Sequence, residues 1–232
     1  MPASSRIVLW LALLAPAASL AEPLPIALPE HRVLSSSETE SFESALAEQL
    51  GAELGRPVQL VVSEGEAAVR MDASLPRGVS AYYRAVPAAL VATEAGPAGW
   101  ADLHDQPVCV SNASPYAPLL RQRFAASPRQ YPSTAHALIG LKLGECVAVV
   151  EDEGLLTELA TLPEWRRYMR LPALDNAERQ LRLVAEDTKL QQELDALIAR
   201  WSADGSLAEL TRQWIDEVAF QAYVLADTLD CH

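Results

Sequence analysis

Three adjacent carboxylates, Glu151, Asp152 and Glu153, stand where an apolar run ends. Residues 146–150, before them, have the β-branched composition of a buried strand, so the acids come at a strand end. Carboxylates at such a position can serve as an acid/base pair in catalysis or hold a cationic group. Three adjacent acids also form an ordinary solvated turn, and these interpretations stay open at this point.

Residue types found in metal sites and catalytic motifs are present, but not at the spacing that such sites need. The four histidines are scattered, with no H-x-x-x-H pair and no Cys/His cluster, so the sequence predicts no metal site. It contains no G-x-S-x-G motif and no P-loop. We therefore expect no cofactor. The missing motifs argue only weakly against an enzyme, because any two carboxylates can supply an acid and a base.

The three cysteines indicate the redox environment. Cys109 and Cys146 each lie in an apolar, strand-like run, and Cys231 is the next-to-last residue. In an oxidising compartment two cysteines can pair and one is left over. Neighbouring strands would bring Cys109 and Cys146 within bridging reach, so we predict this disulfide, with two buried thiols as the alternative. Cys231 is either free or paired with another chain.

The first 21 residues have the three parts of a secretory signal peptide. Arg6 supplies the basic residue, residues 7–14 the apolar core, and a run of small residues ends at Ala21. The core is shorter than the roughly 20 apolar residues that a membrane anchor needs. We expect cleavage before Glu22 and no membrane insertion of the mature chain.

Composition excludes further classes of function. The chain has 18 Lys and Arg against 31 Asp and Glu, a net charge of −13 that becomes −14 once Arg6 is removed with the leader. A field of that sign repels nucleic-acid and anionic lipid phosphates, and no basic stripe offsets it. A hydrophobic fraction of 50% is enough for a folded core.

The mature chain begins with a strand, a helix and a strand. Residues 23–29 are predicted as the first strand and residues 57–62 as a buried second one. Between them, residues 42–54 place apolar side chains at steps of four, on one face of a helix that Gly55 ends. This order is typical of a parallel α/β sheet.

The remaining elements follow the same alternation. Further strands are predicted at 85–93, 108–110, 146–150 and 181–185, and helices at 134–143, 153–162, 190–201 and 207–215. Ser114 is predicted as the N-cap of another helix, with Pro115 at its first position. Residues 216–232 are interpreted as an additional polar tail.

The end of the chain resembles that of the family 3 periplasmic solute-binding proteins, which deliver polar amino acids to ABC transporters. Residues 190–214 show that family's helix, Asp-Gly turn and second helix with a late tryptophan. Residues 80–83, Ser-Ala-Tyr-Tyr, resemble its S-x-P-Y-Y stretch without the proline. Residues 108–114 and 137–152 are similar to other pieces, in the family's order, and residues 42–54 match its signature helix in part.

The resemblance implies an α/β fold of the two-lobed periplasmic binding protein type II kind. Two crossing segments would join the lobes, with the ligand in the cleft and closure by hinge motion. Lobe 1 would comprise residues 22–92 and 181–232, and lobe 2 residues 93–180. The resemblance also implies a periplasmic location.

Residue roles are implied in the same way. Ser114, with N–H groups at its helix N-terminus, would hold a ligand carboxylate, and Asp152 would hold the ligand's ammonium. The implied ligand-binding set is Ser114, Asp152, Arg70, Arg77, Tyr82 and Asn112. The two arginines are candidates for the carboxylate clamp, although neither has the family's usual offset from the tyrosine stretch.

One departure from the family affects the function. Only residues 63–79 separate the second predicted strand from the tyrosine stretch, too few for the usual helix and strand, so we expect a reduced first lobe. The leading hypothesis is a domain that binds an amino acid or related small carboxylate for an ABC permease. The alternative is an accessory or interaction module that has lost its ligand. A third hypothesis is a periplasmic dehydratase that uses the acids at 151–153.

Overall fold

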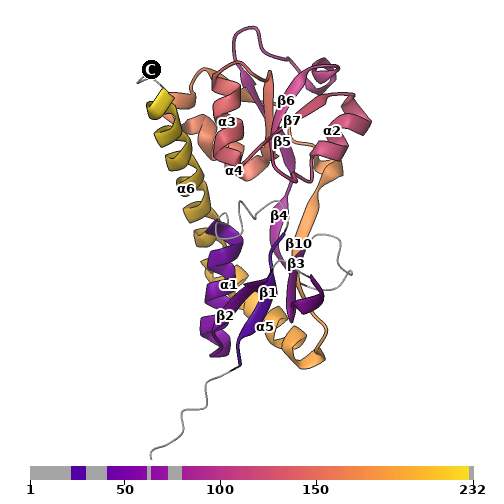
Figure 1. Ribbon diagram of the computed structural model, residues 1–232, viewed down its shortest axis with the longest axis vertical. Coiled ribbons are helices and arrows are strands. Elements are labelled where there is room, and N and C mark those ends of the chain that lie inside the picture. The colour runs from indigo at the N-terminus through magenta and orange to yellow at the C-terminus, as the bar shows by residue number, and fades with distance from the viewer. Residues whose placement is uncertain (1–21, 30–40, 62–63, 73–79, 230–232) are drawn as a thin grey trace, which may run out of the picture.

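The computed structural model describes residues 22–29, 41–61, 64–72 and 80–229. The predicted signal peptide, Arg77 and Cys231 lie outside this range. Figure 1 shows two α/β lobes, with a long helix running along one side of both. No helix in the described part of the chain combines the length and apolar character needed to cross a bilayer.

The first sheet contains five strands in the order β2-β1-β3-β10-β4. These strands are β1 (Leu24–Ala27), β2 (Val58–Val61), β3 (Val69–Asp72), β4 (Ala81–Ala85) and β10 (Arg179–Ala185). β1 pairs in parallel with β2 and β3, whereas β10 is antiparallel to β3 and β4. Helix α1 (Ser41–Leu54) connects β1 to β2, which confirms the predicted strand-helix-strand opening. A 3-10 turn, η2 (Glu64–Glu66), stands between β2 and β3.

The second sheet has the order β7-β6-β8-β5-β9. Its strands are β5 (Pro87–Ala92), β6 (Pro107–Ser111), β7 (Ser127–Tyr131), β8 (Ala148–Asp152) and β9 (Tyr168–Arg170). β6 is parallel to β7 and β8, and β5 is antiparallel to β8 and β9. Three helices follow its parallel strands, namely α2 (Ala117–Phe124), α3 (Thr134–Lys142) and α4 (Glu153–Thr161).

The second sheet is covered on both faces. Alternate residues of its strands point to opposite sides, so Ala88 and Leu90 belong to one apolar cluster and Ala89 and Val91 to another. The first cluster includes α3 and α4, and the second includes α2 and the short turn η3 (Trp100–Leu103). Both faces are therefore closed by helices that lie between the sheet's own strands in sequence.

The first sheet packs mainly on one face. Leu24 and Ile26 of β1 and Leu181 and Leu183 of β10 lie in the same cluster as α1. The C-terminal helices α5 (Thr188–Asp204) and α6 (Ser206–Leu229) complete this cover. Gly205 joins them at a φ of 88°, a left-handed conformation that a residue without a Cβ adopts at no steric cost.

The chain crosses between the sheets twice. The first crossing is Val86, whose carbonyl accepts a hydrogen bond from Glu153 N at 2.7 Å. The second runs from residue 171 to 178 and contains the turn η5 (Asp175–Ala177). Arg84 Nε of β4 lies 2.8 Å from Glu178 Oε2, so a partly exposed ion pair joins β4 to the end of the second crossing. The lobe boundaries at 92 and 180 stay a prediction, and strand pairing puts β5 in the second sheet.

Helix α6 packs against both lobes. Its buried side chains Trp214, Val218 and Ala222 share one apolar cluster with Phe42 of α1 and Leu138 of α3. The interpretation of residues 216–232 as a polar tail is wrong for the described part of that segment. The helix continues to Leu229 because its apolar residues keep the helical spacing along the face that contacts the two lobes.

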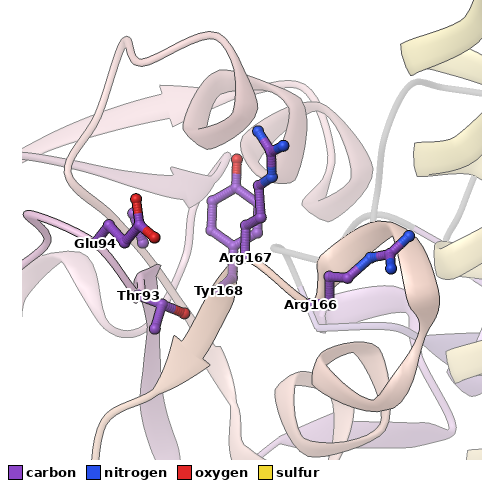
Figure 2. A pocket seen from close by; sticks show the side chains of 6 residues that line it. Thr93, Glu94, Arg166, Arg167 and Tyr168 are labelled. Atoms are coloured by element: carbon purple, nitrogen blue, oxygen red, sulfur yellow. The ribbon is translucent and has the colours of Figure 1, made fainter.

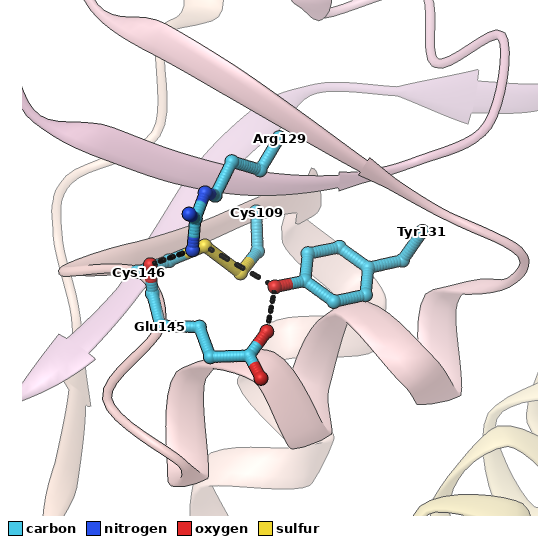
Figure 3. The surroundings of a disulfide bond; sticks show 5 residues. All are labelled: Cys109, Arg129, Tyr131, Glu145 and Cys146. Atoms are coloured by element: carbon cyan, nitrogen blue, oxygen red, sulfur yellow. Dashed lines mark hydrogen bonds between the residues drawn. A yellow bond between two sulfur atoms is a disulfide. The ribbon is translucent and has the colours of Figure 1, made fainter.

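The predicted disulfide between Cys109 and Cys146 is confirmed (Figure 3). It joins β6 to the segment just before β8, with the two Cα atoms 5.7 Å apart. Tyr131 lies beside it, with its hydroxyl 3.8 Å from Cys146 Sγ and hydrogen-bonded to Glu145. Gly140 of α3 packs on the bridge so closely that an added Cβ would lie 2.9 Å from Cys109 Sγ.

Two further predictions about local structure are corrected. The strand at 57–62 was expected to be buried, but β2 is an edge strand on which Leu60 is 43% exposed. Ser114 does not cap α2, because the helix begins at Ala117 with Tyr116 as its N-cap. The short strands β3, β4, β7 and β9 were not predicted, since three to five residues with mixed polarity carry no clear period.

Candidate functional site

The second sheet has a topological switch point between β6 and β8. From β6 the chain passes through α2 to β7 on one side, and from β7 through α3 to β8 on the other. The loops that follow the carboxyl ends of these neighbouring strands therefore leave in opposite directions. In open α/β sheets the resulting crevice is where ligands bind.

Tyr116 contacts two of the predicted ligand residues at this point, Ser114 through its backbone and Asp152 through its side chain. The Ser114 hydroxyl accepts a hydrogen bond from Tyr116 N at 3.3 Å, and the Tyr116 hydroxyl donates one to Asp152. All three residues are buried. Sequence reasoning missed Tyr116, although its position two residues after Ser114 was the available signal.

A second buried carboxylate, Glu151, adjoins this group. Thr134 Oγ1 donates a hydrogen bond of 3.3 Å to Glu151 Oε2, and Asp152 N donates one of 3.1 Å to Glu151 Oε1. Thr134 is the first residue of α3, so the carboxylate lies at a helix N-terminus, where negative charge is favoured. We call Ser114, Tyr116, Thr134, Glu151 and Asp152 the β6–β8 site.

The β6–β8 site has a negative electrostatic character. Burial raises the pKa of Tyr116 well above its usual value, and the charges of Asp152 and Glu151 raise it further. The phenol therefore stays protonated and remains a hydrogen-bond donor to Asp152. Two carboxylates therefore act together on the Tyr116 phenol.

In the loop after β6, backbone N–H groups donate hydrogen bonds to backbone carbonyls of the protein itself. Asn112 N donates to Tyr131 O at 2.7 Å, Ser114 N to Ser111 O at 3.1 Å, and Ala117 N to Ser114 O at 3.2 Å. Asn112 is exposed on this loop. A ligand carboxylate at Ser114 would require these bonds to rearrange, and its predicted role stays a prediction.

The third acid of the run is placed differently from the first two. Glu153 Oε1 lies 3.1 Å from Arg170 Nη1, in a half-exposed ion pair between α4 and β9. Glu151 and Asp152 are buried instead. The three adjacent acids are thus divided between the switch point and a surface ion pair.

The first lobe contributes an aromatic cluster next to the site. Phe42 of α1 packs against Tyr82, Tyr83 and Trp214, with ring centroids 6.0, 5.2 and 6.0 Å away. The Tyr82 hydroxyl donates to the buried Glu43 at 3.5 Å. The Tyr83 phenol lies close enough to influence the pKa of Tyr116. Tyr83 therefore connects this cluster to the second lobe.

Only one of the two arginines predicted to clamp a ligand carboxylate lies within the described residues. Arg70 lies on β3, half-buried, opposite Ala27 and Val184 in the strand register. Arg77 falls outside the described residues. Convergence of either arginine with Ser114 and Asp152 stays a prediction.

A cavity of about 520 Å³ lies away from the switch point, at the start of β9 (Figure 2). Its lining comprises Ala92, Thr93, Glu94, Arg166, Arg167 and Tyr168. Figure 2 shows the guanidinium groups of Arg166 and Arg167 pointing in different directions, so they form no two-pronged anion clamp. Within the described ranges, no group of three or more His, Cys, Asp or Glu residues is placed to hold a metal ion.

Comparisons with known proteins find matches to the fold but none to the sequence. No family model matches the sequence, and no curated protein matches it. Solved structures do match in fold. ArgBP from T. maritima, in a mutant form, aligns with a TM-score of 0.62 and 16% identity over 84% of this chain and 95% of its own.

Two further structures agree. A Salmonella typhimurium periplasmic binding protein, described as highly specific for arginine, aligns with a TM-score of 0.62 and 16% identity over 84% of this chain and all of its own. An ancestral amino-acid-binding protein, described as a precursor of cyclohexadienyl dehydratase, has a TM-score of 0.61 and 16% identity over 83% of this chain and 95% of its own. The chain therefore has the two-lobed periplasmic binding protein fold.

Proposed function

We propose that the protein is a periplasmic solute-binding protein-like domain whose β6–β8 site binds the cationic group of a small amino compound. One observation carries this proposal, namely the pair of buried carboxylates at the switch point that act together on Tyr116. A buried carboxylate gains most from a charge-assisted bond to a cation. Asp152 would hold the ligand's ammonium or guanidinium group.

The fold neighbours support the same chemistry. They include ArgBP, an ancestral arginine-binding protein and a protein of high arginine specificity, as well as the substrate-binding protein of an amino acid ABC transporter. Delivery of the solute to an ABC permease is part of the proposal, as is export with cleavage before Glu22. Sequencing the N-terminus of the protein recovered from the periplasm tests the cleavage site.

The binding proposal is tested by calorimetric titration of protein that has been dialysed from denaturant to remove retained solute. L-arginine, L-lysine, L-glutamine and L-glutamate are the probes. We expect the two cationic amino acids to bind more tightly than the neutral and acidic ones. Asp152→Asn should weaken cation binding by about 10- to 100-fold, since a hydrogen bond to a charged group is worth about 1.5–3 kcal/mol.

Glu153→Gln is the matched control, because it removes an adjacent carboxylate that pairs with Arg170 on the surface. Its affinity for the cationic probes should match that of the wild type. Equal affinity of Asp152→Asn and wild type, or no binding of any probe at millimolar concentration, would refute the proposal.

A second candidate function is an interaction module with no small-molecule ligand. Two observations favour it. The backbone donors of the β6 loop are bonded internally, and α6 packs against both lobes, which restrains hinge opening. Small-angle scattering with and without each probe separates the candidates, because a receptor that closes on its ligand becomes more compact.

A further inference from the structure

The outer face of α6 changes character along its length. Phe220, Tyr223 and Val224, in the C-terminal half, are 64%, 56% and 42% exposed. Positions i, i+3 and i+4 lie on one side of a helix, so these three side chains form a continuous apolar surface, which we call the α6 stripe. A contiguous exposed apolar patch of this kind is typical of an interaction site.

The N-terminal half of the same face is an ordinary solvated surface. Arg212 is hydrogen-bonded to Glu209 at 2.6 and 3.1 Å and to Asp216 at 2.9 Å, and all three side chains are largely exposed. Charged residues therefore occupy this face up to Asp216, and apolar residues replace them between Phe220 and Val224. The α6 stripe is a local feature rather than a property of the whole helix.

The fold itself does not need the α6 stripe. Val218 and Ala222 are buried on the opposite side of the same stretch, where they pack in the core shared with α1 and α3. The C-terminal half of α6 is thus apolar on two sides, a pattern expected of a helix that is covered all round. A second contact surface, outside this chain, would account for it.

Charge indicates what covers the stripe. Asp216, Glu217 and Asp227 flank it and are exposed. The sequence after Arg212 contains no Lys or Arg. A second copy of this chain would bring carboxylates against carboxylates, on a protein whose net charge is already −13, so self-association through this face is disfavoured.

We propose that the α6 stripe is the docking surface for a different protein, whose contact helix or groove has an apolar centre and a rim of Lys and Arg. Phe220 and Tyr223 are the anchors, since aromatic side chains carry most of the affinity at such interfaces. The flanking carboxylates steer the basic rim toward the helix. This surface lies outside the β6–β8 site and does not depend on whether that site binds a solute.

The test uses two designed probes. One is a dye-labelled amphipathic helical peptide with leucines on one face and lysines along both edges, and the other has glutamates in place of the lysines. Fluorescence anisotropy measures their affinities at low and high salt. We expect the lysine-edged peptide to bind at least about tenfold more tightly than the glutamate-edged peptide, with the difference falling as salt rises.

Variants assign the binding to the α6 stripe. The double variant Phe220→Ser, Tyr223→Ser should lose at least about tenfold in affinity for the lysine-edged peptide. Its melting temperature should be unchanged, because both residues are exposed. Leu60→Ser removes an exposed apolar side chain on β2, away from the α6 stripe, and should bind as the wild type does. Asp152→Asn should also keep full affinity, which separates this inference from the proposed solute site.

Several outcomes would overturn the inference. Equal loss in the Leu60→Ser control, or unchanged affinity in the double variant, would mean that the peptide binds without regard to the α6 stripe. Equal affinity for both peptides would contradict the proposal that the partner has a basic rim. A dimer in sedimentation analysis that dissociates in the double variant would make the occupant a second copy of the chain.

Discussion

The two sheets have the same strand order but obtain their cover from different parts of the chain. Each has three parallel strands, then one antiparallel strand, and then an edge strand that is antiparallel to that one. In the second sheet, helices that follow its own strands cover both faces. In the first sheet, α5 and α6, which come more than a hundred residues after β1, supply much of the cover.

This difference makes the first lobe dependent on distant sequence. Short connections let α2, α3 and α4 pack on the strands beside them, and the Cys109–Cys146 bridge ties the result together. The first lobe instead closes around Trp201 and Trp214, which arrive last in the chain. Loosening the packing around Trp201 and Trp214 should therefore expose the first sheet more than the second, although α6 also contacts α3 and α4 of the second lobe.

Replacing Trp214 should produce the largest difference in stability between the two lobes. Trp214→Ala should cost about 3–5 kcal/mol of unfolding free energy, since a fully buried indole leaves a large cavity. Hydrogen exchange should rise more in β1, β3 and β10 than in β6 and β8. Phe220→Ala, on the outer face of the same helix, is the control and should change stability by less than about 0.5 kcal/mol. Greater loss of protection in the second sheet would contradict the comparison.

Removing the disulfide should destabilise the second lobe rather than the first. The bridge closes a loop over a sequence separation of 37 residues, so the double variant Cys109→Ser, Cys146→Ser should lose about 2–4 kcal/mol of unfolding free energy. Exchange should rise in β6 and β8 first. Cys231→Ser controls for the loss of a thiol as such. Faster exchange confined to the first sheet would show that the bridge does not stabilise the lobe that contains it.

A substitution in the β6–β8 site should lower the stability of the second lobe by a smaller amount. Tyr116→Phe removes the donor to Asp152, and we expect a loss of about 1–3 kcal/mol in urea unfolding. Tyr168→Phe, on the edge strand β9, is the matched control and should change stability less. A Tyr116→Phe protein as stable as the wild type would mean that this hydrogen bond contributes nothing net.

The same tyrosine gives a pH dependence of known sign. Because the folded-state pKa of Tyr116 is raised above its usual value near 10, its contribution is complete below that pH. It is lost as pH rises through the folded pKa, since the unfolded chain ionises more readily. Urea titrations between pH 8 and 11 should show a shallower decline for Tyr116→Phe than for the wild type. Tyr131 and Tyr168, whose pKa values are also raised, account for part of the decline in both proteins.

The ion pair between β4 and the second crossing should have the smallest effect. Arg84 is exposed, so Arg84→Gln should leave the melting temperature nearly unchanged. Faster exchange should be confined to residues 171–178, where Glu178 loses its partner. A marked destabilisation of either sheet would show that the crossings, and not only the helices, hold the lobes.

Much of the fold could be predicted from local pattern. Residues 42–54 repeat apolar side chains at helical spacing, and the confirmed helix α1 covers them. The strand around Cys109 and the strand that ends at Asp152 were likewise predictable, because each is an apolar run bounded by turn residues or acids. Strands such as β9, with three residues, depend on pairing with a neighbour and carry no such signal.

The site was less predictable than the elements around it. Asp152 and Ser114 were identified through a resemblance in motif order, and the structure places them on either side of Tyr116. Tyr116 stands in the same loop, two residues after Ser114, but its contact with Asp152 depends on β8 lying beside β6. The Thr134 contact to Glu151 depends on α3 returning to the switch point, and no spacing within a single segment indicates it.

The sequence by itself determined the α/β alternation and the acidic character, because periodicity and charge are local properties. It predicted the Cys109–Cys146 bridge with two buried thiols as the alternative, and the structure decided between them because residues 37 apart in sequence meet only in the fold. Only the tertiary structure decided which of the three adjacent acids are buried and that α6 extends across both lobes. Burial and long-range packing depend on which segments meet. For Glu151 and Asp152 that meeting occurs at the switch point, whereas Glu153 turns outward to Arg170.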